Sequence, residues 1–303
     1  MSRSLHLGTR GSALSLAQAT LVTQALRSRG IAIEIVPIRT TGDHNQRESS
    51  IDLGMGVFVK ELEQALLRGR VDLAVHSAKD LPTAETDGII MAAVLRRGDA
   101  RDALISRDGM GLAELTPGSW IGTDSPRRRA FTLAARPDLR VRGIRGNVDT
   151  RLRKLQAGDV DALVLAATGL QRLGLAHQIT EILSPEVMLP AVGQGTLVVQ
   201  LRVDDPALAL VAQLDDYATR QELLAERAFL RSMGGGCRAP FAALAQCNGK
   251  QLDLDGAAIS PEGDRIIREQ VSGASDQADS LGTRMAERLL ARGAAKLAVE
   301  SQR

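Results

Sequence analysis

A short pattern occurs twice in the first half of the chain: an apolar strand-like segment, a Gly-Thr turn, a serine and a helix-like segment. The two copies are Gly8-Thr9-Arg10-Gly11-Ser12 and Gly122-Thr123-Asp124-Ser125. Each serine stands where it can cap the following helix, and Pro126 occupies a first helical position, where proline is well tolerated. Ordinary strand-helix-strand connections can also produce so short a repeat, but the pattern favours two related α/β lobes with parallel strands.

Around these turns, strand-like and helix-like segments alternate. We predict strands near residues 5–8, 31–35 and 71–76, and helices near residues 12–29 and 58–68. Residues 39–56 are polar and glycine-bearing and show neither period, which indicates a long loop of the kind that often forms a lid.

The pattern changes near Tyr217. We expect a helix over residues 217–232, two or three alternating strands between residues 239 and 271, and a last helix over residues 274–292. This layout predicts a separate α+β domain. Its first loop contains Gly-Gly-Gly-Cys at residues 234–237, where the glycines either form a flexible turn or clear space for a group bonded to Cys237.

Length and composition suit a large soluble protein, since 303 residues with 44% hydrophobic content can bury the cores of two or three domains. The first residues contain no uninterrupted apolar stretch, so we expect no signal peptide. With only two cysteines, the expected setting is a reducing cytoplasm without structural disulfides.

Several classes of partner are disfavoured by composition. A net charge of +2 and an aromatic content of 2% argue against nucleic acid. No segment is long and apolar enough to cross a membrane, and the four histidines lack metal-ligand spacing, so we expect neither a membrane nor a metal. The basic residues are mostly arginine, whose planar fork suits carboxylates and phosphates.

The arginines follow successive strand ends. Arg127, Arg128 and Arg129 open a helix, where positive charge opposes the helix dipole, so we expect an anion to compensate them. Arg145, Arg151 and Arg172 come near the next two strand-to-helix junctions. Each can be an ordinary surface arginine, but together with the capped helix N-termini they indicate a cradle for a polycarboxylate in the cleft between the lobes.

A second group of polar residues ends the strand at 71–76. Ser77, Lys79 and Asp80 follow an apolar run directly. Lys79 and Asp80 can be a simple surface pair; the functional interpretation is a carboxylate that moves protons or stabilises a cation. No Gly-x-Gly-x-x-Gly follows a strand, which argues against an oxidoreductase.

Taken together, these segments resemble the porphobilinogen deaminase (hydroxymethylbilane synthase) family from near residue 5 to near residue 300. The resemblance rests on LGTRGSALSLAQA, FVKELEQALL, VDLAVHSAKDLPT, IGTDSPRRR, RGNVDTRL, LPAVGQG and AERAFLRSMGGGCRAP. So many segments in the same order make the match specific, whereas Gly-Gly-Gly-Cys alone is a weak signal.

The resemblance implies an architecture of two periplasmic-binding-protein-like lobes and a smaller α+β C-terminal domain. The first lobe is discontinuous, residues 1–95 with 191–212. The second lobe, residues 96–190, carries the arginine-rich cradle, and residues 217–303 carry the cysteine.

The resemblance also implies the chemistry. Four porphobilinogen molecules are condensed head to tail, with release of ammonia, and linear hydroxymethylbilane is released by hydrolysis. A dipyrromethane cofactor is held through a thioether to Cys237, and Asp80 assists ammonia loss and stabilises positively charged pyrroles. The residues expected near the cofactor are Ser77, Lys79, Thr123, Ser125, Arg127, Arg128 and Arg145, and those expected to bind substrate are Arg10, Ser12, Arg151 and Arg172. The enzyme is expected to be a cytoplasmic monomer.

A few positions depart from the family pattern. Met55 stands where a glycine-flanked lysine is usual, Asp124 and Pro126 replace the usual Ser and Leu, and Gln200 replaces a frequent glutamate. Asp80, Cys237 and the matched arginines are all retained, so activity is expected, with altered behaviour of the loop that contains Met55.

Two other functions are compatible with parts of the sequence. A cytoplasmic two-lobed anion-binding or sensor protein would use the cleft without catalysis. A cysteine hydrolase would use Cys237 as a nucleophile and would need a base such as His76 or His177.

Overall fold

The computed structural model describes residues 4–38, 59–234 and 240–300. The chain divides into two compact units. The first comprises residues 1–98 and 196–220, and the second comprises residues 99–195 and 221–303.

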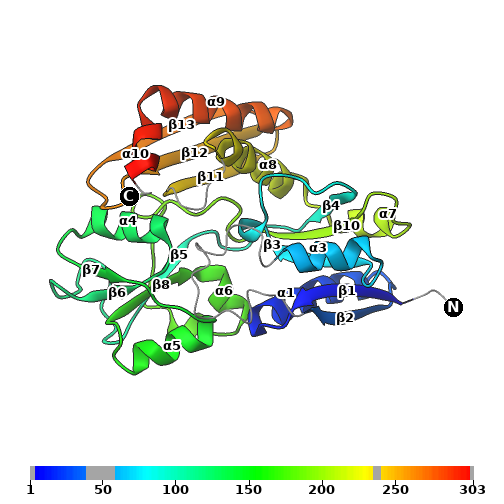
Figure 1. The fold of residues 1–303 in the computed structure, drawn as a ribbon, viewed down its shortest axis with the longest axis horizontal. Coiled ribbons are helices and arrows are strands. Elements are labelled where there is room, and N and C mark those ends of the chain that lie inside the picture. The colour runs from blue at the N-terminus through cyan, green and yellow to red at the C-terminus, as the bar shows by residue number, and fades with distance from the viewer. Residues whose placement is uncertain (1–3, 39–58, 235–239, 301–303) are drawn as a thin grey trace. The chain divides into compact units, whose positions relative to one another are not determined.

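The first unit is built on a five-stranded sheet in the order β2-β1-β3-β10-β4 (Figure 1). β1 runs parallel to β2 and β3, whereas β10 runs antiparallel to β3 and β4. The prediction of parallel strands is therefore wrong for β10. The chain re-enters the unit at residue 196, so no strand-helix-strand connection determines the direction of this strand. The bounds are β1 (Leu5–Arg10), β2 (Ile33–Ile38), β3 (Leu73–Ser77), β4 (Ile89–Val94) and β10 (Leu197–Arg202).

Helices cover both faces of this sheet. Helix α1 (Ala13–Arg27) begins at Ser12, whose hydroxyl accepts a hydrogen bond from the Ser15 backbone at 3.2 Å, as predicted. α1 and α7 (Leu208–Val211) share a core with Leu73 and Val75. Helix α3 (Lys60–Leu67) packs with Ala74 instead. Because alternate residues of a strand point to opposite faces, α1 and α3 lie on opposite sides of the sheet.

The second unit contains another five-stranded sheet, in the order β7-β6-β8-β5-β9. β6 runs parallel to β7 and β8, and β5 runs antiparallel to β8 and β9, so this sheet is also mixed rather than wholly parallel. One core contains residues of α4, and the other contains residues of α5 and α6. The bounds are β5 (Asp102–Ser106), β6 (Trp120–Gly122), β7 (Arg140–Arg142), β8 (Ala162–Ala166), β9 (Glu181–Ile182), α4 (Pro126–Ala135), α5 (Val148–Gln156) and α6 (Ala167–Arg172).

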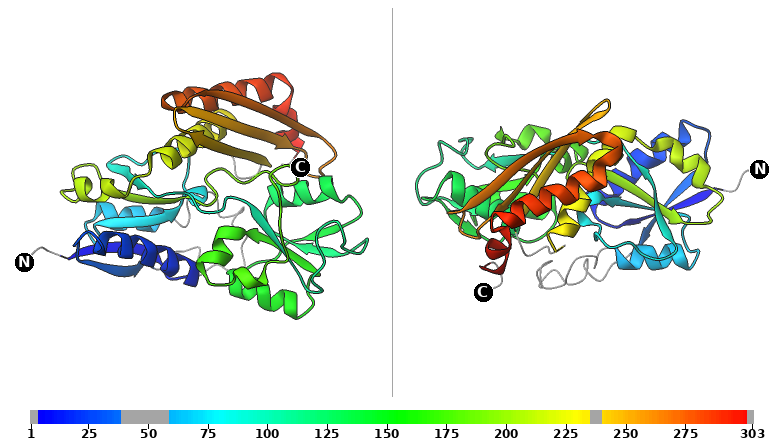
Figure 2. Two further views of the ribbon diagram at one scale, coloured as in Figure 1. Left: turned by 180° about the vertical axis from the view of Figure 1, so that it is seen from behind. Right: turned by 90° about the horizontal axis from the view of Figure 1, so that it is seen from above.

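A three-stranded antiparallel sheet completes the second unit. α8 and α9 share a core with one face of this sheet (Figure 2). The other face contributes Ala242, Ala257 and Ile259 to the core that contains Phe131 of α4. The bounds are α8 (Tyr217–Ser232), β11 (Phe241–Asn248), β12 (Gln251–Ile259), β13 (Ile266–Ala274), α9 (Ala278–Ala291) and α10 (Ala294–Glu300).

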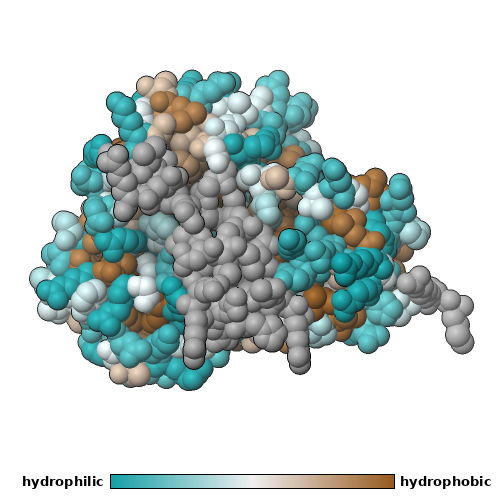
Figure 3. Space-filling view, viewed as in Figure 1, coloured by the Kyte–Doolittle hydropathy of each residue, from teal (hydrophilic) through white to brown (hydrophobic). Residues whose placement is uncertain are grey.

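The expected fold class, α/β lobes with a smaller α+β C-terminal domain, is confirmed. On the face that Figure 3 shows, apolar side chains form small separate groups among polar ones. In the described part of the chain, no helix has both the length and the apolar character needed to cross a membrane.

The hairpin between β12 and β13 packs directly against α4. Glu262, near its tip, accepts hydrogen bonds from Arg129 at 2.9 and 3.1 Å. Gly263 has a φ of +76°, and a Cβ at this position would lie 2.4 Å from the Ala130 carbonyl oxygen and 2.5 Å from the Ala134 nitrogen. Only glycine allows this close approach, so the C-terminal sheet holds the helix that carries the arginines.

We expect Gly263→Ala to reduce the free energy of unfolding more than Gly249→Ala. Gly249, in the neighbouring hairpin, also has a positive φ, +63°, but a Cβ there would meet no atom within 4 Å. The control should lose about 1 kcal/mol from backbone strain, and Gly263→Ala about 3 kcal/mol because a clash is added. Urea unfolding of both variants measures the difference, and equal losses would show that the packing of this hairpin on α4 contributes little.

Candidate functional site

In the first unit, the predicted polar residues gather at one edge of the sheet. Arg10 ends β1 and Ser77 ends β3, and because these neighbouring strands are parallel, their carboxyl ends lie together. Lys79 and Asp80 follow in a 3-10 turn, Ala78–Asp80. Asp80 is exposed and Lys79 is half-buried, so the carboxylate is accessible to a ligand.

Two serines at this edge are already engaged in the protein itself. The Ser12 hydroxyl caps α1 and lies 2.8 Å from the Ser15 hydroxyl. The Ser77 hydroxyl accepts a hydrogen bond of 2.9 Å from Gln18, a buried residue of α1. Gln18 was not predicted as a site residue, although a glutamine on the buried face of a helix is a usable signal.

His76 is buried beside this edge and stays neutral. The pKa of its ring is lowered to about 4, mainly by burial and also by the nearby charge of Arg10, while a hydrogen bond with the Gln200 side chain partly opposes the change. Among the described residues, its Nε2 atom has no hydrogen-bond partner. His76 therefore contributes no positive charge at neutral pH.

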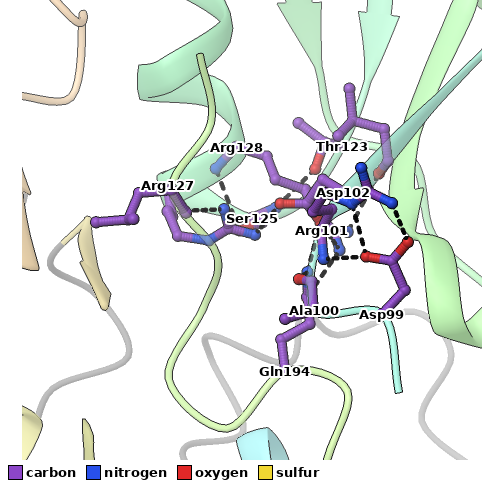
Figure 4. Close-up of polar contacts among 11 residues, drawn as sticks. Asp99, Ala100, Arg101, Asp102, Thr123, Ser125, Arg127, Arg128 and Gln194 are labelled. Carbon is purple, nitrogen blue, oxygen red and sulfur yellow. Dashed lines mark hydrogen bonds and ion pairs between the residues drawn. The ribbon is translucent and has the colours of Figure 1, made fainter. Parts of the chain in front are cut away.

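In the second unit, Arg127 and Arg128 converge on one carboxylate (Figure 4). Arg127 Nη2 lies 2.7 Å from Asp102 Oδ2, and Arg128 Nη2 lies 2.8 Å from Asp102 Oδ1. The Asp102 side chain is fully buried, and both arginine side chains are less than 10% exposed. We call these three residues with Gln194 the Asp102 cluster.

Backbone and amide groups complete the Asp102 cluster. Arg127 donates to the Leu189 carbonyl at 2.6 Å and Arg128 to the Val164 carbonyl at 3.1 Å. Gln194 donates to Asp102 at 2.9 Å and to the Ala100 carbonyl at 2.7 Å. The cluster therefore joins the first strand of the unit, α4, β8 and the segment that ends at residue 195.

Electrostatics agree with this geometry. Burial alone would raise the pKa of Asp102, but the charges and hydrogen bonds of Arg127, Arg128 and Gln194 lower it to about 2. Burial lowers the pKa of Arg127, and Asp102 opposes that change. The cluster has two cations and one anion, so it carries a net positive charge.

The sequence predicted that an anion compensates the three arginines of α4. Carboxylates of the chain itself pair with all three. Asp102 pairs with Arg127 and Arg128, and Glu262 pairs with Arg129. None of these partners was predicted from the sequence, and neither was the contact of Gln194 in the Val-Gly-Gln-Gly segment. All lie far from α4 in sequence, and only the fold brings them to it.

The other predicted cations of the second unit have fewer carboxylates near them than Arg127 and Arg128. Arg151 donates to the Gly146 carbonyl at 2.8 Å and Arg172 to the Gly195 carbonyl at 2.7 Å. Burial lowers the pKa of Arg172 to about 10, and burial together with the charge of Arg128 lowers the pKa of Arg151. Within the described residues, neither side chain forms a salt bridge with a carboxylate. Arg145, also half-buried, precedes α5 on the loop after β7.

Thr123 and Ser125 lie at the start of α4, next to these cations. The Ser125 hydroxyl accepts a hydrogen bond of 3.4 Å from the Arg128 backbone, and the Ser125 backbone donates to the Thr123 hydroxyl at 3.2 Å. Asn147 occupies the cap position of α5 but forms no side-chain capping bond there.

Cys237 lies outside the described residues, as does the predicted loop with Met55. The other predicted residues fall into two groups, one in each unit. Arg10, Ser12, Ser77, Lys79 and Asp80 belong to the first unit, and Thr123, Ser125, Arg127, Arg128, Arg145, Arg151 and Arg172 belong to the second.

Comparison with known proteins covers nearly the whole chain. Residues 5–209 match the family described as porphobilinogen deaminase, dipyromethane cofactor binding domain, and residues 220–291 match the porphobilinogen deaminase C-terminal domain. Among solved structures, the methionine binding protein MetQ is 13% identical, with 74% of this chain and 96% of that chain covered and a TM-score of 0.45.

Curated relatives agree with the family match. The porphobilinogen deaminase of Acidothermus cellulolyticus is 48% identical, with 97% of this chain and 90% of the relative covered. That of Roseiflexus castenholzii is also 48% identical, with 97% and 98% covered. These matches do not favour a binding protein without catalysis. The chain belongs to the porphobilinogen deaminase family, the transferases of tetrapyrrole biosynthesis that use a dipyrromethane cofactor to condense porphobilinogen into hydroxymethylbilane.

Proposed function

We propose that this enzyme divides its work between the two groups of residues, with Asp80 as the catalytic carboxylate and the second-unit arginines as the anion site. The observation that carries the proposal is the excess of partly buried positive charge in the second unit. Arg151 and Arg172 lose hydration without gaining a salt bridge among the described residues. Such an arrangement is costly unless a ligand supplies anions.

The cofactor fits this charge distribution. Each pyrrole unit carries an acetate and a propionate, so a dipyrromethane brings four carboxylates to a region with surplus guanidinium groups. Cys237 would hold the cofactor through its sulfur, and Thr123, Ser125, Arg127, Arg128 and Arg145 would lie along it, with Ser77 and Lys79 contributing from the first unit. When bound, the cofactor supplies the pyrrole chain to which substrate units are joined.

The arginines have different parts in this proposal. Arg127 and Arg128 are fixed by Asp102 and by backbone carbonyls, so they form a rigid positive base. Arg151 and Arg172 each hold one carbonyl and are less buried, which leaves donors for substrate carboxylates. Arg10 and Ser12 would contact substrate from the first unit.

Asp80 is suited to the step that releases ammonia. Loss of the amino group leaves positive charge on the substrate pyrrole, and a carboxylate held next to it stabilises that charge as it develops. The 3-10 turn Ala78–Asp80 and the hydrogen bond from Gln18 to Ser77 help to position the segment that carries Asp80. We also propose that the enzyme is a monomer in the cytoplasm.

The covalent link can be tested by intact mass spectrometry. We expect a dipyrromethane-sized addition on the purified protein that is absent from Cys237→Ser and present in Cys247→Ser. Cys247, in β11, is the matched control because it is the other cysteine. An active enzyme with an unmodified Cys237 would contradict the proposed attachment.

Asp80→Asn should keep the cofactor mass and lose about 100-fold or more in kcat, because the amide keeps the shape and removes the charge. Asp87→Asn, at another exposed carboxylate of the same segment, should retain the kcat of the wild type. Ammonia release from porphobilinogen measures both. If Asp80→Asn turned over at the wild-type rate, another group would have to supply the charge.

Asp102→Asn should lower the free energy of unfolding by about 3 to 5 kcal/mol, because it leaves two buried guanidinium groups with a neutral partner. Asp99→Asn is the matched control. Asp99 pairs at 2.8 Å with Arg101, whose side chain is 47% exposed, and such a pair contributes only about 0 to 1 kcal/mol. Denaturant unfolding compares them, and similar losses would mean that the Asp102 cluster does not hold the unit together.

A further inference from the structure

Asp124 is a carboxylate among the cations of the second unit. It stands between Thr123 and Ser125, immediately before α4, and is half-buried. Arg145 from the loop after β7, and Arg151 and Lys154 from α5, act on it electrostatically, and Arg128 of α4 acts on Arg151. An acid at this position is unexpected in a site that has to attract carboxylates.

The loop that carries Arg145 is folded around this carboxylate. Asp124 accepts a backbone hydrogen bond from Ile144. A Cβ at Gly143 would lie 2.6 Å from Asp124 Oδ1, so the backbone of the loop passes close to the carboxylate. Lys154 then donates to the Arg145 carbonyl at 3.1 Å, which ties the same loop to α5. Asp124 is thus built into the site rather than left on the surface.

We propose that Asp124 is an internal anion that competes with the carboxylates of porphobilinogen for Arg145 and Arg151, and so sets the affinity of the enzyme for its substrate. The inference rests on the proposed role of these arginines. In this role Asp124 adjusts how strongly the site attracts the negative charge of the substrate, whereas the arginines bind the substrate carboxylates directly.

Proton linkage follows from the surroundings of Asp124. Burial raises the pKa of Asp124, and the charges of Arg151, Arg145 and Lys154 limit that increase. A bound substrate carboxylate pairs with these cations, which weakens their effect on Asp124, and it places a second negative charge near Asp124. Both effects raise the pKa of Asp124 further on binding. Binding is therefore accompanied by proton uptake. Lowering the pH protonates Asp124, removes its negative charge from the surroundings of Arg145 and Arg151, and so strengthens binding of the substrate.

The test compares Asp124→Asn with the wild-type holoenzyme in the KM for porphobilinogen and in kcat, from about pH 4, near the ordinary pKa of an aspartate, to about pH 7. The wild-type KM should rise with pH. The variant should show a weaker dependence and, at the upper end, a KM about three- to tenfold lower, with a smaller change in kcat. Titration of the substrate's own carboxylates affects both proteins equally, so the difference between them reports Asp124.

A second readout does not depend on turnover. In an Asp80→Asn background, calorimetric titration with porphobilinogen in two buffers of different ionisation enthalpy should show proton uptake, and Asp124→Asn should reduce it. Asp124→Ser separates charge from loop anchoring. If charge matters, Ser and Asn shift the KM alike; if only the loop anchor matters, Asn restores wild-type behaviour and the proposal is overturned.

Two controls separate this inference from the proposed function. Asp149→Asn removes the same charge from an exposed position of α5 and should keep the wild-type pH profile. Arg151→Gln should raise the KM strongly; if it does not, the proposed anion site fails. If Arg151→Gln raises the KM while Asp124→Asn keeps the wild-type KM at every pH, only the role of Asp124 is overturned.

Discussion

The contact of Asp102 with two buried guanidinium groups is the interaction on which the second unit depends. A buried charge is tolerated only when it is paired and hydrogen-bonded, and here each carboxylate oxygen meets an arginine while Gln194 supplies a further donor. Through Val164 and Leu189 the same arginines contact the middle of β8 and the segment before residue 195. The edge that carries the remaining cations is assembled on this base.

One carboxylate cannot neutralise the whole edge, and this imbalance links structure to function. Arg127 and Arg128 pair with a carboxylate of the protein itself, whereas Arg151 and Arg172 donate hydrogen bonds to backbone carbonyls in the part of the chain that is described. A growing chain of pyrroles adds two carboxylates with every unit, so a site for it needs positive charge in excess of its own acids. Asp124 would limit that excess, because binding that is too tight would hinder release of the product.

Much of the fold could be predicted from local patterns. Helix α1 begins at the predicted Ser12, α4 at the predicted Pro126, and α8 has the predicted bounds. The antiparallel directions of β5 and β10 could not be predicted, because strand periodicity is the same in either direction and no local turn connects these strands to their neighbours. The helix α10 was also missed, since it follows α9 after a single turn near Gly293.

For the site, the sequence by itself determined which residues we propose as the carriers of the chemistry. Asp80, Cys237 and the arginines stand in ordered motifs whose identity does not require coordinates, and the family match follows from them. Only the tertiary structure decided which arginines already have a partner. Asp102, Gln194 and Glu262 lie 25 to 133 residues from the arginines they contact. Pairing over such separations depends on how sheets and helices pack, and a one-dimensional pattern contains no information about that distance.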